Sequence, residues 1–97
     1  MANFVYFIKL GQTKYYKIGY TKNLEKRLEQ LQNASPYDVI LIAAFQSSNA
    51  LKLEHQLHGK YSSNRVRGEW FKFNKEEATV IEDGLKANGN QLPIYFQ

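Results

Sequence analysis

Two charged side chains fall on predicted helix faces that are otherwise apolar. Glu54 lies within the apolar stripe of a helix predicted over residues 50–61, about 40° from Ala50 on a helical wheel. Arg27 lies about 70° from the centre of the apolar stripe of a helix predicted over residues 24–33. Burying a carboxylate and a guanidinium is costly unless they are paired or used in chemistry. The pattern therefore allows two hypotheses, a partly buried salt bridge between them or a catalytic cluster.

Neighbouring residues indicate which chemistry such a cluster could perform. His58 follows Glu54 by four residues, the helical spacing at which two side chains can share a metal ion or a proton. One carboxylate and one imidazole are too few for a dedicated zinc site, but one carboxylate and substrate phosphate can together hold a hydrated Mg²⁺ or Mn²⁺. Tyr6 and Lys17 lie on adjacent predicted strands, where their side chains would be close in a tight register. A lone strand tyrosine more often serves packing, so Tyr6 by itself does not indicate a site.

The charge of the chain is concentrated in two segments. Residues 1–30 hold six Lys/Arg and two Glu, a net +4, and residues 52–72 hold five Lys/Arg and two Glu, a net +3, in a chain of net +4. These segments favour a polyanionic partner such as nucleic acid, although an ordinary solvated basic surface explains the charge equally well. The 97 residues contain no cysteine, which excludes disulfides and cysteine-based metal sites. No segment resembles a signal peptide or a membrane span, so we expect a cytoplasmic protein that does not enter a membrane.

The strands and helices that must position these residues are short and are separated by turn-forming residues. Residues 3–10 are apolar on both faces, which predicts a buried strand, and the short connection that follows predicts an antiparallel hairpin with residues 15–20. The order ββαβαβα predicts a single α/β or α+β domain over residues 1–88, with a sheet of three or four strands flanked by helices and a short tail over 89–97. The segment Thr21-Lys22-Asn23 supplies capping side chains for the helix over 24–33. The other predictions are a strand over 38–46, a polar loop over 62–68, a strand over 69–73, and a helix from residue 75 that begins in a capping box of Asn74 and Glu77.

Several short motifs occur in an order typical of one known family. They are Val5-Tyr6-Phe7, Lys17-Ile18-Gly19, the helix start over residues 21–28, Pro36, Glu54 to His58 and Gly68-Glu69-Trp70-Phe71. Over residues 3–73 the chain resembles the GIY-YIG endonuclease superfamily, and in particular the compact phage and bacterial branch in which a lysine replaces the tyrosine of the second motif. The resemblance implies a small three-stranded mixed or antiparallel sheet flanked by helices, one divalent metal ion, and hydrolysis of a DNA phosphodiester.

The resemblance also implies roles for individual residues. Tyr6 would position or deprotonate the attacking water, Arg27 would clamp the scissile phosphate, and Glu54 would be the sole protein ligand of the metal. Lys17 would add positive charge or assist the base, and His58 or Tyr20 would replace a histidine that some members carry at the position of Leu31. A late asparagine of the family has two candidates, Asn64 and Asn74, and Glu69, Trp70 and Phe71 are assigned a structural role. The residues predicted to contact nucleic acid are Lys14, Tyr20, Lys22, Lys26, Lys60, Arg65 and Arg67.

The resulting prediction is a minimal metal-dependent DNA endonuclease with Mg²⁺ or Mn²⁺ as cofactor. The alternatives are a nucleic-acid-binding module that does not cleave and a toxin-like domain that depends on a partner. So small a chain leaves little for sequence recognition, so we expect weak specificity and an affinity dominated by phosphate contacts. Cleavage of both strands would require successive nicks or a homodimer.

Overall fold

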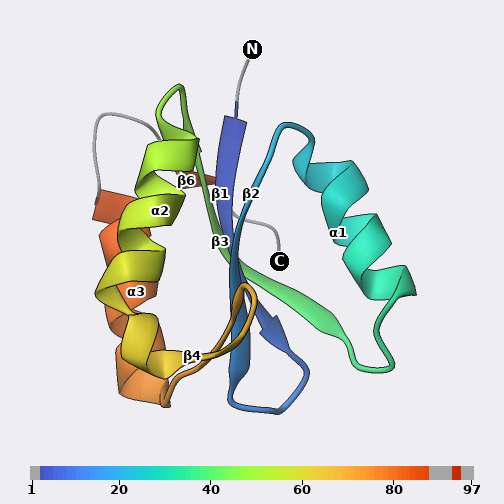
Figure 1. The fold of residues 1–97 in the computed structure, drawn as a ribbon. Helices are drawn as coiled ribbons and strands as arrows, with labels where there is room; N and C mark the ends of the chain where they lie inside the picture. Colours follow the sequence, from blue (N-terminus) through green and yellow to red (C-terminus); the bar gives the residue numbers. More distant parts are fainter. Residues whose placement is uncertain (1–2, 88–92, 95–97) are drawn as a thin grey trace.

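A computed structural model describes residues 3–87 and 93–94, which form an antiparallel sheet with helices on both faces (Figure 1). The strands are β1 (Asn3–Leu10), β2 (Tyr15–Thr21), β3 (Val39–Ser47), β4 (Arg65–Arg67), β5 (Trp70–Lys72) and β6 (Pro93–Ile94). The helices are α1 (Leu24–Asn33), α2 (Ala50–Lys60) and α3 (Lys75–Ala87), with a 3₁₀ turn, η1, over Ser62–Asn64. None of the helices within these residues is long and apolar enough to cross a membrane.

The sheet has the order β4-β5-β2-β1-β3-β6, and every neighbouring pair in it is antiparallel. The predicted hairpin of β1 and β2 is confirmed, with Tyr6 opposite Gly19 and Ile8 opposite Lys17. On the other side of β2, β5 pairs only with residues 15–17. The second half of β2 therefore runs beyond the end of its neighbour, and this uncovered edge positions the candidate site.

Both faces of the sheet are covered, which explains the apolar run in β1. The face covered by α2 and α3 holds a core that includes Phe7, Ile18 and Phe71. The face covered by α1 holds a smaller core around Tyr6 and Ile8, completed by the leucines of α1. Because β1 contributes alternate side chains to both cores, its four central residues, Val5 to Ile8, are all fully buried.

The predicted helix starts are largely confirmed. The Asn23 side chain accepts a hydrogen bond from the Lys26 backbone N–H at 3.0 Å, which caps α1. Asn74 and Glu77 form a reciprocal capping box at the start of α3, with distances of 2.8 and 2.9 Å. The side chain of Asn49, at the start of α2, makes no capping hydrogen bond.

The predicted sheet of three or four strands is wrong, because the described residues form a sheet of six strands. Of the mixed and antiparallel alternatives, the structure has the antiparallel one. The missed strands are the outermost ones. β4 lies in the segment predicted as a polar loop, and all three of its residues are exposed, so it carries no apolar alternation to signal a strand. β6 has only two residues, and it falls within the predicted tail, whose remaining positions lie outside the described residues. Short edge strands of this kind need no buried face.

Candidate functional site

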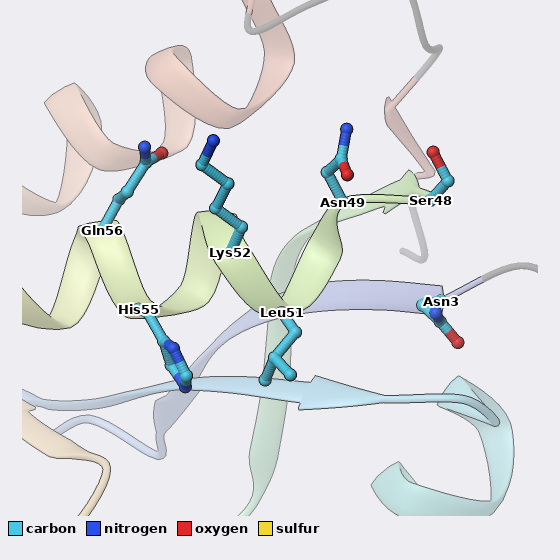
Figure 2. A pocket seen from close by; sticks show the side chains of 7 residues that line it. All are labelled: Asn3, Ser48, Asn49, Leu51, Lys52, His55 and Gln56. Carbon is cyan, nitrogen blue, oxygen red and sulfur yellow. The ribbon is translucent and has the colours of Figure 1, made fainter.

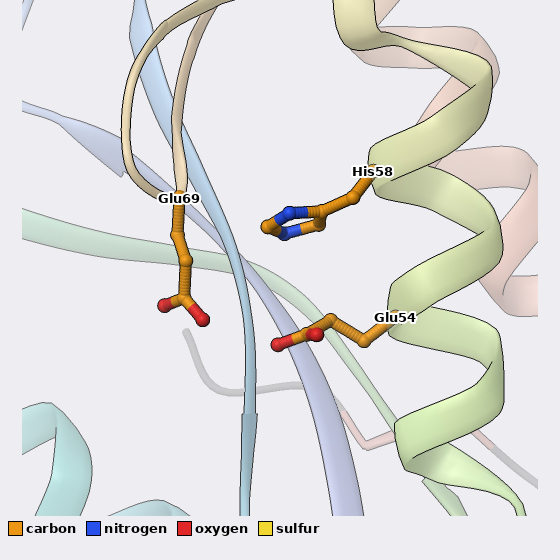
Figure 3. Close-up of side chains that lie close together, drawn as sticks. All are labelled: Glu54, His58 and Glu69. Carbon is orange, nitrogen blue, oxygen red and sulfur yellow. The ribbon is translucent and has the colours of Figure 1, made fainter.

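The candidate site forms where α2, the β4–β5 turn and the edge of β2 meet. Glu54 and His58 project from α2, and Glu69 projects from the turn toward them (Figure 3). Ligand atoms of these three residues all lie within 4.8 Å of one another. Glu54 is buried with a relative exposure of 6%, as the helical wheel predicted, while the Glu69 side chain is 37% exposed. The site therefore combines a buried carboxylate, a more accessible carboxylate and an imidazole.

Glu69 joins this cluster to the opposite face of the sheet through Lys17. Its Oε1 lies 2.9 Å from Nζ of Lys17, which is itself buried and lies over the ring of Trp70. Gly68, with φ +54°, supplies the backbone conformation that a two-residue hairpin turn of type II′ needs at its first central position. The turn places Glu69 directly beside the end of β5, where its carbonyl accepts a hydrogen bond from Ile18 N–H at 3.3 Å.

Tyr6 and Arg27 meet on the α1 side of the same edge. Nε of Arg27 donates a hydrogen bond to the Tyr6 hydroxyl at 3.3 Å, and Tyr6 is fully buried. The tyrosine ring lies directly over Gly19, where a Cβ atom would overlap its Cζ and hydroxyl oxygen. The absence of a side chain at Gly19 therefore creates the space in which the Tyr6 hydroxyl reaches Arg27.

His58 is held by hydrogen bonds on both ring nitrogens. Nε2 lies 2.8 Å from the carbonyl oxygen of Ile18, and Nδ1 lies 3.3 Å from Nη2 of Arg65. A carbonyl only accepts and a guanidinium only donates, so these two contacts fit the tautomer that carries its proton on Nε2. Its ring also packs edge-on against Phe71. These contacts fix His58 beside the two carboxylates.

The two carboxylates have different protonation behaviour. Burial, followed by the nearby charge of Glu69, raises the pKa of Glu54 above its usual value of 4.5. Burial alone would also raise the pKa of Glu69, but the hydrogen bond and the charge of Lys17 outweigh it and hold that pKa below its usual value. A carboxylic acid and a carboxylate can share one hydrogen bond, and such a bond contributes to the raised pKa of Glu54 and to the lowered pKa of Glu69.

Tyr6 is poorly suited to act as a base. Burial raises the pKa of its hydroxyl, although the hydrogen bond from Arg27 opposes this effect, and the charges of Glu69 and Glu54 raise it further. The hydroxyl therefore keeps its proton at neutral pH. Of the two roles predicted for Tyr6, the raised pKa disfavours deprotonation of a water by this side chain.

The structure thus brings together all five predicted catalytic residues, Tyr6, Lys17, Arg27, Glu54 and His58. The alternative of a salt bridge between Arg27 and Glu54 is not formed within residues 3–87 and 93–94, because Arg27 contacts Tyr6 and Glu54 contacts His55 and Glu69. Glu69 was assigned a structural role from the sequence, and the structure places its carboxylate beside Glu54 and His58. The signal that could have found it is the pairing of strands, which places the residue before Trp70 next to Lys17.

The residues predicted to bind nucleic acid do not form one patch. Lys14 precedes β2 and Lys22 follows it, so they lie at opposite ends of a strand about 23 Å long, while Lys22 and Lys26 are both exposed at the start of α1. The two arginines of β4 contact different parts of the protein. Arg65 contacts His58 and Phe71, whereas Arg67 lines a pocket with Trp70 and Tyr15.

Two further residues predicted to bind nucleic acid, Tyr20 and Lys60, make contacts within the protein. The Tyr20 side chain packs against the core beneath α2 and α3, so it does not take the place of the family's histidine at Arg27. Lys60 lies over the ring of Tyr61 at 5.5 Å. The candidates for the late asparagine are structural as well, because Asn64 donates to the Lys72 carbonyl at 3.1 Å and Asn74 caps α3.

A pocket of about 570 Å³ opens at the beginning of α2 (Figure 2), and Glu54, His58 and Glu69 are not among the residues that line it. It is lined by polar side chains that include Asn49, Lys52 and Gln56. His55, which is also in its lining, is the link to the cluster, because its Nε2 lies 3.7 Å from Oε1 of Glu54. None of the five predicted catalytic residues lines this pocket.

These features define a small α+β domain with two carboxylates, an imidazole and two basic side chains gathered at the edge of an antiparallel sheet. The family model of the T5orf172 domain matches residues 3–84, and the chain belongs to the T5orf172 domain family. This match corrects the assignment to the GIY-YIG endonuclease superfamily, which rested on the order of several short motifs, one of them with Lys17 in place of its tyrosine.

A curated viral protein is similar to most of the chain. The putative KilA-N domain-containing protein 315L of Invertebrate iridescent virus 6 is 35% identical over 73 residues. The match covers 72% of this chain and 30% of the viral protein, so the chain spans about a third of that relative's length. No solved structure matches the chain.

Proposed function

We propose that this domain is a metal-dependent endonuclease that hydrolyses DNA phosphodiester bonds. The observation that supports this most directly is the convergence of Glu54, Lys17, Arg27 and Tyr6 at one sheet edge, from four different elements. Phosphodiester hydrolysis needs a positioned nucleophile and neutralisation of the charge that develops on phosphate. A tyrosine hydroxyl, two cationic side chains and a buried carboxylate supply these requirements.

Arg27 is the residue best placed to bind the scissile phosphate. Its bond to Tyr6 uses only Nε, so the two terminal nitrogens of the guanidinium are the ones placed for two parallel hydrogen bonds to phosphate. Movement of Arg27 toward a phosphate would uncover the Tyr6 hydroxyl. Tyr6 is fully buried while Arg27 is hydrogen-bonded to it. The freed hydroxyl would then hydrogen-bond to the attacking water and orient it. Lys17 adds a second positive charge that would stabilise the transition state.

The residues of the cluster fit a divalent cation. Glu54 brings a buried carboxylate to the site and Glu69 lies nearby, and carboxylate oxygens are the ligands that Mg²⁺ and Mn²⁺ prefer. Glu54 is the residue that would hold the ion, together with oxygens of the phosphate. When bound, such a cation neutralises charge on the phosphate and on the leaving oxygen.

The positive charge of the chain and its similarity to other proteins both favour DNA as the substrate. The basic segments over residues 1–30 and 52–72 supply the residues around the site and the exposed lysines at the start of α1. The T5orf172 domain and the similarity to a KilA-N domain-containing protein agree with a DNA-binding or nuclease-like module. The alternative function is a module that binds DNA without cleaving it.

Incubation with supercoiled plasmid separates these two functions. We expect nicking with Mg²⁺ or Mn²⁺ and none with EDTA, and the ratio of open-circular to linear product distinguishes single nicks from paired cuts. Tyr6→Phe keeps the ring that packs on Gly19 but lacks the hydroxyl, so it should nick at least about a hundredfold more slowly. Equal nicking by Tyr6→Phe would assign the activity to a contaminant or to other residues. Intact plasmid with both cations, although bound, would favour the binding module.

The salt dependence of DNA binding tests the phosphate contacts. Lys22→Ala and Arg27→Ala should each reduce the slope of log affinity against log salt by about one, because each removes one phosphate contact. Lys75→Ala is the matched control, since Lys75 is exposed at the start of α3 and lies outside both basic segments. Fluorescence anisotropy with a labelled duplex at several salt concentrations measures the slopes. Slopes identical to that of the control would show that neither residue contacts phosphate.

A further inference from the structure

We infer that Glu69 supplies a second carboxylate to the divalent cation held by Glu54, so that the ion would join α2 to the β4–β5 turn. This inference rests on the metal requirement of the proposed function and goes beyond it, because that function needs only Glu54. It changes the role of Glu69 from a partner of Lys17 to a metal ligand. It also makes the cation a further link between α2 and the β4–β5 hairpin, beside the contacts of His58 with Arg65 and Phe71.

The geometry of the two carboxylates carries the inference. They come from different elements and point toward one another across a short gap (Figure 3), and ligand atoms of the cluster lie within 4.8 Å of one another. Two oxygens bound to one Mg²⁺ or Mn²⁺ lie about 3 Å apart, since each is about 2.1 Å from the ion. The cluster therefore needs to contract by no more than about 2 Å. Glutamate side chains make such movements by rotation about χ angles.

His58 is close to the carboxylates, but both of its ring nitrogens already take part in hydrogen bonds. Its Nε2 proton is donated to Ile18 and its Nδ1 accepts from Arg65, so neither ring nitrogen offers an unshared lone pair. The donors at the site are therefore carboxylate oxygens. An all-oxygen donor set favours Mg²⁺ and Mn²⁺ over Zn²⁺, which prefers nitrogen and sulfur ligands.

Lys17 competes with the cation for Glu69. Its ammonium lies 2.9 Å from Oε1 of Glu69 and makes an ion pair that the metal would have to displace or share. Displacement of Lys17 from Glu69 by the cation would leave the ammonium free to contact the phosphate that we propose Arg27 binds. One movement of the Glu69 side chain would then assemble both the metal site and the second positive charge.

Titration with MnCl₂ in the absence of DNA tests the inference by isothermal calorimetry. We expect Glu69→Gln to weaken Mn²⁺ binding by at least about tenfold, the smallest loss typical of disturbed metal sites, and Glu54→Gln to weaken it more. Lys17→Gln should tighten binding, because it removes the competing charge. Glu29→Gln changes an exposed glutamate of α1 and should bind Mn²⁺ as the wild type does.

The double variant Lys17→Gln/Glu69→Gln separates ligation from an effect through Lys17. If Glu69 is a ligand, its replacement weakens Mn²⁺ binding about equally with and without Lys17. If Glu69 only neutralises Lys17, its replacement has no effect once Lys17 is gone, and that result would overturn the inference. Circular dichroism checks the fold, and Lys17→Met replaces Lys17→Gln in the cycle if the latter does not fold.

The outcomes also distinguish this inference from the proposed function. Loss of Mn²⁺ binding in Glu54→Gln with wild-type binding in Glu69→Gln would reject Glu69 as a ligand and leave a site held by Glu54 alone. Unchanged binding in both variants would reject the metal site of the proposed function as well.

Discussion

Glu54→Gln is expected to unfold at higher denaturant concentration than the wild type in EDTA, and to have lost cleavage with Mg²⁺. In the metal-free protein Glu54 is buried next to Glu69, and this arrangement disfavours the charged carboxylate. An amide of nearly the same shape removes the charge and can donate a hydrogen bond to the Glu69 carboxylate. We expect the free energy of unfolding to rise by about 1 kcal/mol, within the range found when strain at an active site is relieved.

The gain in stability should depend on pH in a defined direction. Because the pKa of Glu54 is raised in the folded state, protonated Glu54 stabilises the fold fully below the unfolded-state pKa, and this contribution disappears as pH rises through the folded pKa. The amide does not titrate. The two proteins should therefore have similar stability near pH 4, and the variant should become the more stable one as pH increases toward neutrality.

Urea unfolding in EDTA at a series of pH values measures this difference, and the plasmid assay measures the activity. Loss of the metal ligand removes several kcal/mol of transition-state stabilisation, which corresponds to a rate reduction of about a thousandfold. Glu29→Gln controls for the general effect of removing one negative charge, since Glu29 is exposed on α1. A variant that is less stable than wild type at neutral pH would mean that Glu54 contributes to the fold rather than to a cation site.

Gly19→Ala should damage both stability and activity, although it adds only one methyl group. The new Cβ would overlap the ring carbon and hydroxyl oxygen of Tyr6, and Tyr6 is fully buried between the sheet and α1. The ring cannot move away without displacing Arg27 or the leucines of α1. Overpacking of this kind costs about 1–3 kcal/mol, and displacement of a positioning residue by about 1 Å can slow a reaction by about a hundredfold.

Gly84→Ala provides a matched control for this substitution. Gly84 lies within α3 with no atom near the position of its Cβ, so alanine should stabilise the helix by about 0.5–1 kcal/mol. Thermal unfolding and plasmid nicking of both variants give the comparison. If Gly19→Ala matches the wild type in both measurements, the close packing of Tyr6 on Gly19 is not required for the site.

The sequence was most informative where burial imposes a periodic pattern. Strand β1 was predicted with its observed bounds because both of its faces are covered, and the helical wheel placed Glu54 toward the interior, where it lies. The capping segment over residues 21–23 and the capping box at Asn74 were predicted because hydrogen bonding at a helix start depends only on nearby residues.

Contacts between distant segments were not predictable in the same way. Strand β4 has no buried face and β6 is very short, so neither had an apolar pattern, and the sheet was predicted too small. The role of Glu69 depends on how β5 pairs with β2, which local sequence does not determine. The family assignment failed for a related reason, since short motifs built from strand residues and a glycine occur in unrelated sheets.

The contact between His58 and Ile18 also bears on the behaviour of the protein at high concentration. A strand that extends past its neighbour leaves backbone groups that can pair with another chain and initiate aggregation. Here the Ile18 carbonyl, at the point where β5 ends, accepts its hydrogen bond from an imidazole instead of from a strand. The side chain that borders the two carboxylates thus also occupies a backbone acceptor that an added strand would need at this edge.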